Sequence, residues 1–585
     1  MEKTASSRFG HVMNKIQVEA EPGLTNKQLF LTNHDLKPVE PERRLWKHRN
    51  FVTFWIADSF NINTWMIAAS SLTVGLSWWQ AWICVWVGYS IAAFFICLTG
   101  RIGAMYHIGF PVVNRASFGI WGSLWPVLNR SVMACIWYGV QSWIGGQCVY
   151  LMIAAIWPSF VHSPRMNAPL AMGATVNYMI GFIIFWVCSL PFIWFPPHKI
   201  RHLFTFKSIV APAGGIALFA WAIARAGGVG PIVHQGSTAK GSDLAWGIIS
   251  GIMSAVSNFA TLIVNDPDFA RFASRPSAAL WPQAITIPMG FGLTSFIGII
   301  AGSSSAVIFP SVGAVWNPLD LLKYFVIGGV DRTSGHGTAG ERAGTFFIAF
   351  TFVVAQLGTN IAANSISAGT DLTALLPRYI NIRRGGYLCA IIGLAICPWQ
   401  FLTSSSNFTT YLSAYSVFLS SIAGPMIADY YFVRRGYLQI RDLYNAESSG
   451  PYWGIYGIQW RGWVAYICGI LINVVGFAGA VGTPVPIGAT YIYRLNFFSG
   501  FIVSAGVYWL LAKISPMPAL SPTGKWLEIG DEIRNPSLVY DNDAEADMAR
   551  ARARAGYGSG SEEMGDEQIV EKGDGKSWWK VGKKS

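Results

Sequence analysis

The chain of 585 residues is 52% hydrophobic and only 12% charged, about half the charged fraction of an ordinary soluble domain. This composition excludes a purely soluble protein and predicts an all-α protein whose main partner is the lipid bilayer. The formal net charge of +12 is not accompanied by a basic face or an aromatic RNA-binding motif, which excludes a nucleic-acid partner. The eight cysteines lie inside apolar stretches without metal-ligand spacing, so neither a metal site nor a cofactor is predicted.

Twelve apolar stretches are predicted to cross the membrane, because each is long enough to span the hydrocarbon core. In chain order they are 51–76, 77–99, 119–156, 175–195, 203–225, 244–265, 280–310, 340–377, 386–405, 408–433, 463–483 and 490–514. The polar segments that flank them, 1–50 and 516–585, are predicted to be cytoplasmic tails. Disorder is expected over 1–50 and 530–585, with lysines there available to ubiquitylation and trafficking machinery.

Arginine and lysine predict the orientation, since they concentrate in cytoplasmic loops. They cluster before the first stretch and in alternate loops after it, at Arg43, Arg44, Lys47, Arg49, Arg101, Arg115, Lys199, Arg201, Arg271, Arg275, Arg378, Arg383, Arg384, Arg434 and Arg435. The opposite loops hold fewer basic residues. Both termini are therefore predicted to be cytoplasmic.

The first stretch carries polar residues where a lipid-facing helix would be apolar. Asp58, Asn61 and Asn63 fall within six residues, and such groups in hydrocarbon are costly and tend to be functional. The sixth stretch repeats the pattern with Asn258 and ends near Pro267, which breaks a helix. Both helices are predicted to be interrupted. In the alternative interpretation, the amides only link neighbouring helices.

Two interrupted helices five spans apart indicate two five-helix repeats, and an odd number of spans inverts the second repeat relative to the first. The first repeat is predicted at 51–225. The second repeat is predicted to comprise 244–405 and the span 408–433, and two further helices follow within 463–514. In this transporter architecture, the interrupted helices place a binding site near the middle of the membrane.

The third stretch offers an indole and an amide on one helix face, at Trp137 and Gln141. This pair suits a planar heterocycle, because the ring stacks while the amide reads N–H and C=O groups. The eighth stretch carries Asn360 and Asn364 on one face, and Asn364 is the natural second reader. No lysine or arginine falls in these clusters, which favours a neutral ligand. The alternative is again polar packing between helices.

Ionisable residues near the helix ends are candidates for gating and coupling. Asp58 is the only acid near the middle of the first half. Arg130 lies inside the third stretch and needs a partner at that depth. Asp266, Asp268 and Asp371 are the candidates.

Two other charges receive structural interpretations. Lys207, near the start of the fifth stretch, is expected to extend its ammonium to the membrane interface. Asp429 precedes two tyrosines and an arginine and is interpreted as an anchor at a helix end.

Five long motifs stand out along the chain. They are LKPVEPERRLW, FWIADSFNINTW, TGRIGAMYHIGFPVVNRASFGIWG, LNRSVMACIWYGVQSWIGGQ and FATLIVNDPDFARFA. Together they resemble the fungal branch of the nucleobase-cation-symport-1 family, which contains the uracil, allantoin and uridine permeases and is related to the bacterial hydantoin transporter. The likeness covers roughly residues 33–515. It implies a LeuT-like fold of about twelve transmembrane helices, a five-plus-five inverted repeat with two C-terminal helices.

The resemblance also assigns ligand-binding residues by motif. Trp137 and Gln141 match the stacking tryptophan and the amide of the third helix. Phe259 matches the second aromatic residue of the sixth helix. Asn360 and Asn364 match the amides of the eighth helix, and the resemblance makes Asn364 the ligand.

The resemblance further implies a plasma-membrane location and proton symport, with sodium less expected as the coupling ion. Arg130 and Asp371 occupy positions like those of the family's gating charges. Asp35 is similar to a residue of the family's cytoplasmic lid. Uracil is the first expected substrate, with allantoin, uric acid and uridine as neighbours.

Other classes of protein remain as alternatives. An integral-membrane enzyme would need a catalytic constellation, but the chain has no HExxH or GxSxG motif and its nine histidines are scattered. A channel would lack interrupted helices arranged as a repeat. A nutrient-sensing receptor can keep the transporter fold, and only uptake of more than one ligand per protein separates it from a transporter.

Overall fold

The computed structural model covers the apolar stretches and much of the sequence that flanks them. The described residues are 26–32, 36–170, 173–195, 197–229, 233–329 and 335–528. In this part of the chain the structure is helical, with isolated bridges and no β-strand. The predictions for Asp35 and for residues 1–25 and 529–585 lie outside the described residues.

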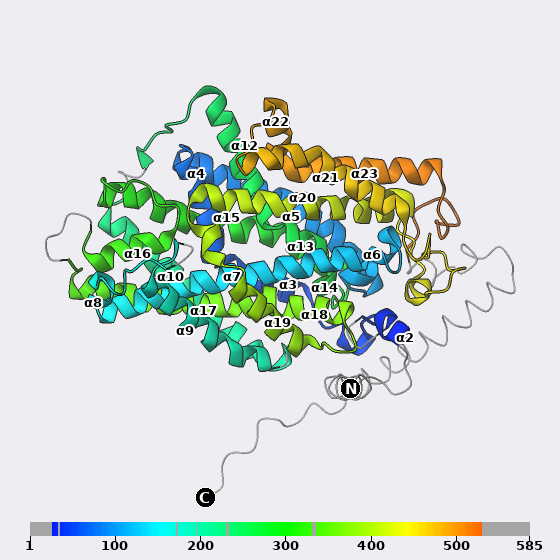
Figure 1. Cartoon of the computed structure of the whole chain (residues 1–585), viewed down its shortest axis with the longest axis horizontal. Helices are drawn as coiled ribbons and strands as arrows, with labels where there is room; N and C mark the ends of the chain where they lie inside the picture. Colours follow the sequence, from blue (N-terminus) through cyan, green and yellow to red (C-terminus); the bar gives the residue numbers. More distant parts are fainter. Residues whose placement is uncertain are drawn as a thin grey trace, which may run out of the picture. The chain divides into compact units, whose positions relative to one another are not determined.

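The helices follow the apolar stretches of the sequence (Figure 1). The first part of the chain forms α2 (Asn26–Leu31), η1 (Pro41–Arg43), α3 (His48–Ser59), α4 (Ile62–Thr73), α5 (Trp78–Tyr106), α6 (Phe110–Phe118), α7 (Leu124–Ile156), α8 (Ser159–His162), α9 (Val176–Trp194) and α10 (Pro197–Arg225). The second part forms α12 (Gly241–Asn258), α13 (Ala260–Asn265), α14 (Pro267–Ala270), α15 (Pro276–Ile308), α16 (Pro318–Ile327), α17 (Ala339–Thr359), η3 (Asn360–Ser365), α18 (Ile366–Leu375), α19 (Ile382–Ala395), η4 (Pro398–Leu402) and α20 (Ser405–Ala428). The last part forms η5 (Asp429–Val433), η6 (Ile440–Tyr444), α21 (Trp460–Ala480), α22 (Ile487–Arg494) and α23 (Asn496–Ile514).

The chain divides into two units. The larger comprises Met1–Asp429 and Ile440–Pro516, and the smaller comprises Tyr430–Gln439 and Met517–Ser585. Within the smaller unit, the Arg434 guanidinium donates to the carbonyl oxygens of Pro518 and Ala519 at 3.0 and 2.7 Å. The Tyr430 hydroxyl donates to the Glu528 carboxylate at 2.8 Å. These bonds hold the segment that follows α23 against the turn that follows α20.

Nine helical stretches among the described residues are long and apolar enough to cross a membrane. The three remaining predicted spans, 51–76, 244–265 and 386–405, do not form single helices of that length. The first two are interrupted, and α19 ends at Ala395 before the short helix η4 begins at Pro398. The exact number of twelve membrane crossings therefore stays a prediction.

Both predicted helix interruptions are present. Between α3 and α4, Asn61 has an extended backbone and its side chain accepts a hydrogen bond from the Asn63 N–H at 3.0 Å, which caps α4. Between α12 and α13, the Phe259 N–H turns back to the Val256 carbonyl at 3.0 Å instead of continuing the helix. Pro267 then occupies the first turn of α14, where its missing N–H is tolerated.

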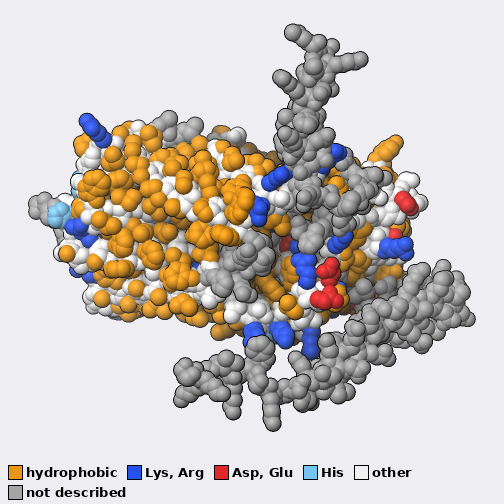
Figure 2. Space-filling model, turned by 90° about the horizontal axis from the view of Figure 1, so that it is seen from below, with side chains coloured by type: hydrophobic (Ala, Val, Ile, Leu, Met, Phe, Trp, Pro, Cys, Tyr) orange, Lys and Arg blue, Asp and Glu red, His pale blue; other side chains and the backbone are white. Residues whose placement is uncertain are grey.

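The long helices pack in a few extended pairs. α5 lies along α15, α7 lies along both α17 and α9, and α20 lies along α23. Outward-facing side chains such as Phe94, Phe347 and Ile502 are more than half exposed. Figure 2 shows hydrophobic side chains over a broad, continuous area of one face. Soluble proteins rarely expose apolar surface on this scale, so this surface is the one expected to face lipid.

The expected disorder of residues 1–50 is wrong for residues 36–50. The Trp46 N–H donates to the Phe272 carbonyl and the Val39 N–H donates to the His107 carbonyl, both at 2.9 Å. Leu36 and Val39 are buried, so this segment packs against the parts of the chain around His107 and Phe272. Burial lowers the pKa of His107, outside the membrane spans, to about 4.

Arg115 anchors the same region from α6. Counted in the sequence as a loop charge, it is buried, and its guanidinium donates to the carbonyl oxygens of Phe30, Leu31 and Leu443 at 3.0 Å. The Tyr444 hydroxyl donates to the Leu36 carbonyl at 2.6 Å. Arg115 therefore holds the N-terminal segment in place by binding its backbone carbonyl oxygens and that of Leu443.

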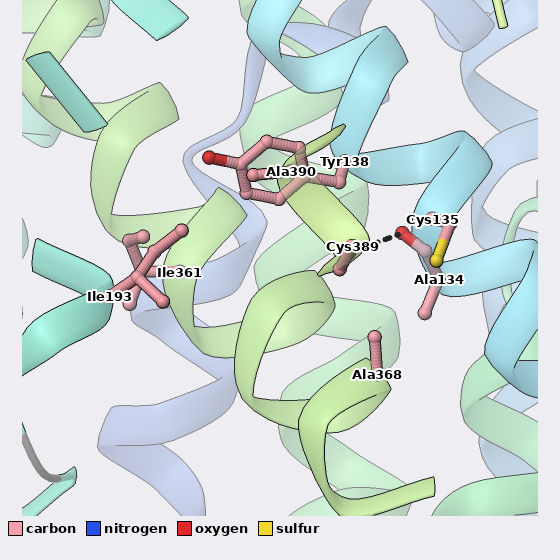
Figure 3. Packing of buried hydrophobic residues seen from close by; sticks show 8 residues of the cluster. All are labelled: Ala134, Cys135, Tyr138, Ile193, Ile361, Ala368, Cys389 and Ala390. Carbon is pink, nitrogen blue, oxygen red and sulfur yellow. Dashed lines mark hydrogen bonds between the residues drawn. The ribbon is translucent and has the colours of Figure 1, made fainter. Parts of the chain in front are cut away.

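Small residues bring α7 close to α19 and α18. Figure 3 shows the cluster in which side chains of α7, α9, η3, α18 and α19 meet, at Ala134, Cys135, Tyr138, Ile193, Ile361, Ala368, Cys389 and Ala390. The backbones approach most closely at Gly139, where an added Cβ would lie 2.5 Å from the Gly393 carbonyl oxygen. Close packing of this kind lets membrane helices associate without a hydrophobic driving force.

We expect Gly139→Ala to lower the thermal stability of the purified protein, because overpacking costs about 1–3 kcal/mol. Gly506→Ala is the matched control, since a Cβ there meets nothing within 4 Å. The measurement is the apparent Tm by fluorescence-detected size exclusion. Equal Tm values for the two variants would contradict the close contact between α7 and α19.

Candidate functional site

A cavity of about 70 Å³ lies where the two interrupted helices meet α7 and η3. Its walls come from α3, α4, α7, α12, α13, α15, α17 and η3. We call it the ligand cavity. Five of the six predicted ligand-binding residues line it, namely Trp137, Gln141, Asn258, Phe259 and Asn364.

Gln141 presents an unused hydrogen-bond acceptor. Its side chain is only 4% exposed, and its Oε1 makes no hydrogen bond to any described residue. Leaving such a buried group unpaired costs about 1–3 kcal/mol. Trp137, one turn earlier on α7, has its ring 5.9 and 6.2 Å from the rings of Tyr411 and Tyr415. α7 therefore presents a fixed indole ring and an amide oxygen that has no hydrogen-bond donor.

Asn360 and Asn364 do not play equal roles. Asn364 lines the ligand cavity, whereas Asn360 lies behind it, fully buried. The Asn360 Nδ2 donates to the Ser142 hydroxyl at 2.9 Å, and its Oδ1 accepts from the Asn364 Nδ2 at 2.9 Å. Asn360 is thus held by Ser142 of α7 and in turn fixes the orientation of Asn364. It is a positioning residue rather than a residue that lines the cavity.

A π-helical turn explains this division. η3 is a π-helical turn that lies between α17 and α18 in the same long helix. Turns of this kind recur at functional sites, and they change which side chains share a helix face. The prediction that Asn360 and Asn364 share one face assumed α-helical spacing throughout. Gln356, four residues before Asn360, donates to Asn61 at 3.4 Å and holds the cap of α4.

Amides also bridge the two interrupted helices. The Asn63 Nδ2 donates to the Asn258 Oδ1 at 3.0 Å, and the Asn258 Nδ2 donates to the Tyr89 hydroxyl at 3.3 Å. All three residues are largely buried, and both asparagines line the ligand cavity. The alternative interpretation, a link between helices, therefore describes these amides as well, but they face the cavity at the same time.

Phe259 is fixed by other aromatic rings. It stacks on Trp55 with the ring centroids 5.8 Å apart, and meets Tyr89 and Phe291 edge-on at 5.1 and 4.8 Å. It is buried and still lines the ligand cavity. The cavity is therefore lined by aromatic rings from two helical segments, Phe259 and Trp137.

Arg130 has the acidic partners that the sequence required. Its Nη1 lies 2.7 Å from the Asp371 Oδ2 and 3.8 Å from the Asp268 Oδ2. Asp266 instead accepts a hydrogen bond from the Gln283 Nε2 at 2.8 Å. Arg130 also lines the ligand cavity, although the polar clusters named in the sequence contain no lysine or arginine. Asp371 offsets the charge of Arg130.

The interpretation of Lys207 as an interface residue is also wrong. Its side chain is only 4% exposed, and its Nζ donates to the Thr359 hydroxyl at 2.7 Å. The face of α10 that carries it packs on α17 rather than on lipid. Asp58, which lines the ligand cavity, is the acid that attracts Lys207 electrostatically. A lysine within an apolar span was itself the signal that could have identified this group.

Asp429 lies at the end of α20, as interpreted from the sequence. Its Oδ1 accepts a hydrogen bond from the Tyr508 hydroxyl of α23 at 2.7 Å, and the residue is buried.

Among the described residues there is no group of three or more His, Cys, Asp or Glu side chains that could hold a metal ion. The chemistry of the site is therefore that of recognition by amides, aromatic rings and a few buried charges.

Comparisons with known proteins agree with this arrangement. Residues 38–500 match the model of the permeases for cytosine/purines, uracil, thiamine and allantoin. The chain is 52% identical over 516 residues to an uncharacterized permease of Schizosaccharomyces pombe, covering 88% of this chain and 86% of that protein. The uridine, allantoin and uracil permeases of Saccharomyces cerevisiae are 45%, 45% and 43% identical, covering 86%, 86% and 85% of this chain and 78%, 79% and 78% of those proteins.

The fold is similar to that of the nucleobase-cation-symport-1 family transporter Mhp1 in a closed conformation with bromovinylhydantoin bound. The TM-score is 0.65 at 23% identity, covering 84% of this chain and 98% of that chain. This likeness confirms the predicted LeuT-like fold. The chain therefore belongs to the nucleobase-cation-symport-1 family of permeases, and it is a membrane transporter of nucleobase-like substrates rather than an enzyme.

Proposed function

We propose that this transporter imports a neutral, single-ring nucleobase-related heterocycle, with uracil as the first candidate, by proton symport across the plasma membrane. The observation that carries the proposal is the unpaired Gln141 amide, which faces the same cavity as Asn364 and lies one helical turn from the Trp137 ring. A lactam or ureide edge offers adjacent N–H and C=O groups that match two amides.

The size of the ligand cavity supports a small ring. A buried water needs about 10–15 Å³ in the same measure, so about 70 Å³ holds the equivalent of several waters. A single ring with its exocyclic oxygens displaces such a cluster, whereas a nucleoside adds a sugar that needs further space. Uracil and allantoin both fit this description, and uridine and uric acid are the larger alternatives.

Uptake through Gln141 and Asn364 tests the site. We expect Gln141→Ala and Asn364→Ala each to reduce the affinity for uracil about tenfold or more, since each removes a buried hydrogen bond. The measurement is radiolabelled uracil uptake in cells that lack their own nucleobase permeases, with allantoin, uridine and uric acid as competitors.

Asn129→Ala is the matched control, because this amide donates to the Trp125 carbonyl on α7 and does not line the cavity. Normal uptake by both site variants at wild-type surface levels would contradict the site. Ligand binding without uptake beyond one molecule per protein would instead favour a nutrient-sensing receptor.

The electrostatic attraction between Asp58 and the buried Lys207 supports coupling to protons. Asp58 faces the ligand cavity, and no hydrogen bond or ion pair to another described residue holds its carboxylate. Among the described residues, Asp58 is the acid that attracts Lys207 electrostatically, while Glu341 of α17 pairs with Arg225 at 2.6 Å. Protonation of Asp58 removes this attraction between α3 and α10.

We expect an uncoupler to abolish uracil accumulation, and replacement of sodium to leave it unchanged. Asp58→Asn should still exchange labelled for unlabelled uracil but fail to accumulate it, because the amide takes up no proton. Uncoupler-sensitive accumulation by Asp58→Asn would contradict the assignment of coupling to Asp58.

We assign a gating role to the pair of Arg130 and Asp371, which joins α7 to α18 beside the ligand cavity. Asp268 of α14 lies 3.8 Å from the same guanidinium. The pair therefore connects the interrupted sixth helix to the rest of the bundle. An ion pair that forms in one state and opens in the other gives such a transporter its access control.

We expect Asp371→Ala to destabilise the protein strongly, because breaking a buried pair costs about 3–5 kcal/mol. The double variant Arg130→Met with Asp371→Leu should recover most of the Tm, since an apolar pair of similar volume is often neutral. Uptake should stay lost in the double variant. Transport by the stable double variant at the wild-type rate would rule out a gating role.

A further inference from the structure

A second cavity, of about 330 Å³, lies on helices that also border the ligand cavity. It lies between the C-terminal half of α4, the first part of the C-terminal half of α12 and the start of α20. Most of its lining side chains are hydroxyls and none is charged, with Ser70, Ser71, Ser250, Ser254, Ser405 and Thr409 among them. We call it the hydroxyl pocket.

The hydroxyl pocket lies one to two helical turns from the ligand cavity. Thr64 of α4 lines the ligand cavity and Ser70 lines the hydroxyl pocket, a separation of about 9 Å at 1.5 Å per residue. On α12, Asn258 and Ser254 are about 6 Å apart by the same measure. The two cavities therefore follow one another along the same pair of interrupted helices.

Aromatic residues of α20 mark the passage from one cavity to the other. Thr409 lines the hydroxyl pocket. Tyr411 and Tyr415, which follow it on α20, contact the ring of Trp137 in the ligand cavity. The Tyr415 hydroxyl also donates to the Ser257 carbonyl of α12 at 2.8 Å. A shift of the first turns of α20 would therefore change both cavities together.

Ser71 leaves a hydrogen-bonding group unused inside the hydroxyl pocket. It is only 3% exposed, and its hydroxyl makes no hydrogen bond within the described part of the chain. Buried polar groups normally have a partner. Gly251 keeps the space beside it open, because a Cβ there would lie 3.0 Å from the Ser71 Oγ. The unpaired hydroxyl and the missing side chain together form a small polar recess.

The other hydroxyls set the chemistry of a ligand. Ser70 and Ser254 donate to carbonyl oxygens of their own helices at 2.7 and 2.8 Å, so their oxygens remain as acceptors. Ser71 adds a free donor. This lining suits a neutral molecule with N–H and C=O groups, whereas an anion would meet no cation and a cation no carboxylate.

We propose that the hydroxyl pocket is a second, outer binding site that holds the neutral heterocycle before it enters the ligand cavity. The inference rests on the proposed function, because the ligand is the substrate of that function. With the N-terminus cytoplasmic, the end of α4 that borders the pocket faces the outside, which is the side from which an imported substrate arrives.

The test counts the uracil molecules bound by the purified full-length protein in equilibrium dialysis with radiolabelled uracil. We expect two per chain in the wild type and one in Gln141→Ala, at uracil concentrations too low to fill the weakened site in the ligand cavity. Adding Ser71→Ala and Ser405→Ala to Gln141→Ala should weaken the remaining site about thirtyfold, since each of the two lost hydrogen bonds contributes about 1 kcal/mol. Ser90→Ala in the same background is the control, because Ser90 is exposed and its hydroxyl bonds the Trp86 carbonyl.

The outcomes separate this inference from the proposed function. One uracil per chain in the wild type and none in Gln141→Ala would overturn the outer site while leaving uracil transport intact. An equal affinity in the Ser71→Ala and Ser405→Ala variant and in the Ser90→Ala control would overturn it as well. A wild-type protein that neither binds nor transports uracil would overturn the proposed function, and this inference with it.

Discussion

Every backbone polar group within the hydrocarbon must find its partner inside the protein, and this constraint determines where the helices of this transporter can be interrupted. At the first interruption, Asn61 supplies the missing partner by capping α4, and Gln356 in turn binds Asn61. At the second, Asn258 is bound by Asn63 from the first. The two breaks are thus stabilised by each other. Of these amides, Asn61, Asn63 and Asn258 also line the ligand cavity.

The amides expected to recognise a ligand are also divided between support and binding. Asn360 uses its whole amide to position Asn364 against α7, while Gln141 is left with a free acceptor. A fully satisfied residue next to an unsatisfied one is the arrangement of a preorganised site, because the supporting groups do not have to move when a ligand binds. The aromatic contacts of Phe259 with Trp55, Tyr89 and Phe291 fix another part of the cavity wall in a similar way.

Buried charges are few, and those near the cavity have a place in the proposed transport cycle. The Arg130 guanidinium is neutralised directly by Asp371. The Lys207 ammonium has a hydroxyl as its direct partner and Asp58 as the acid that attracts it. The direct pair is suited to closing a gate, since it is strong and specific in geometry. The indirect pair is suited to sensing a proton, because a single protonation removes most of the attraction between the two groups.

The sequence by itself determined the membrane class, the two interrupted helices, the family and most of the residues that line the ligand cavity. These features are encoded locally, since hydropathy, a polar cluster or a spacing of four residues is read within one segment. The tertiary structure alone decided that Asn360 stands behind Asn364, because a π-helical turn changes the faces of the helix. It alone decided that Lys207 is buried and that residues 36–50 are ordered, because both depend on which distant segment covers them. The local sequence pattern determines which side chains share a helix face, whereas only tertiary packing determines which other segments contact that face.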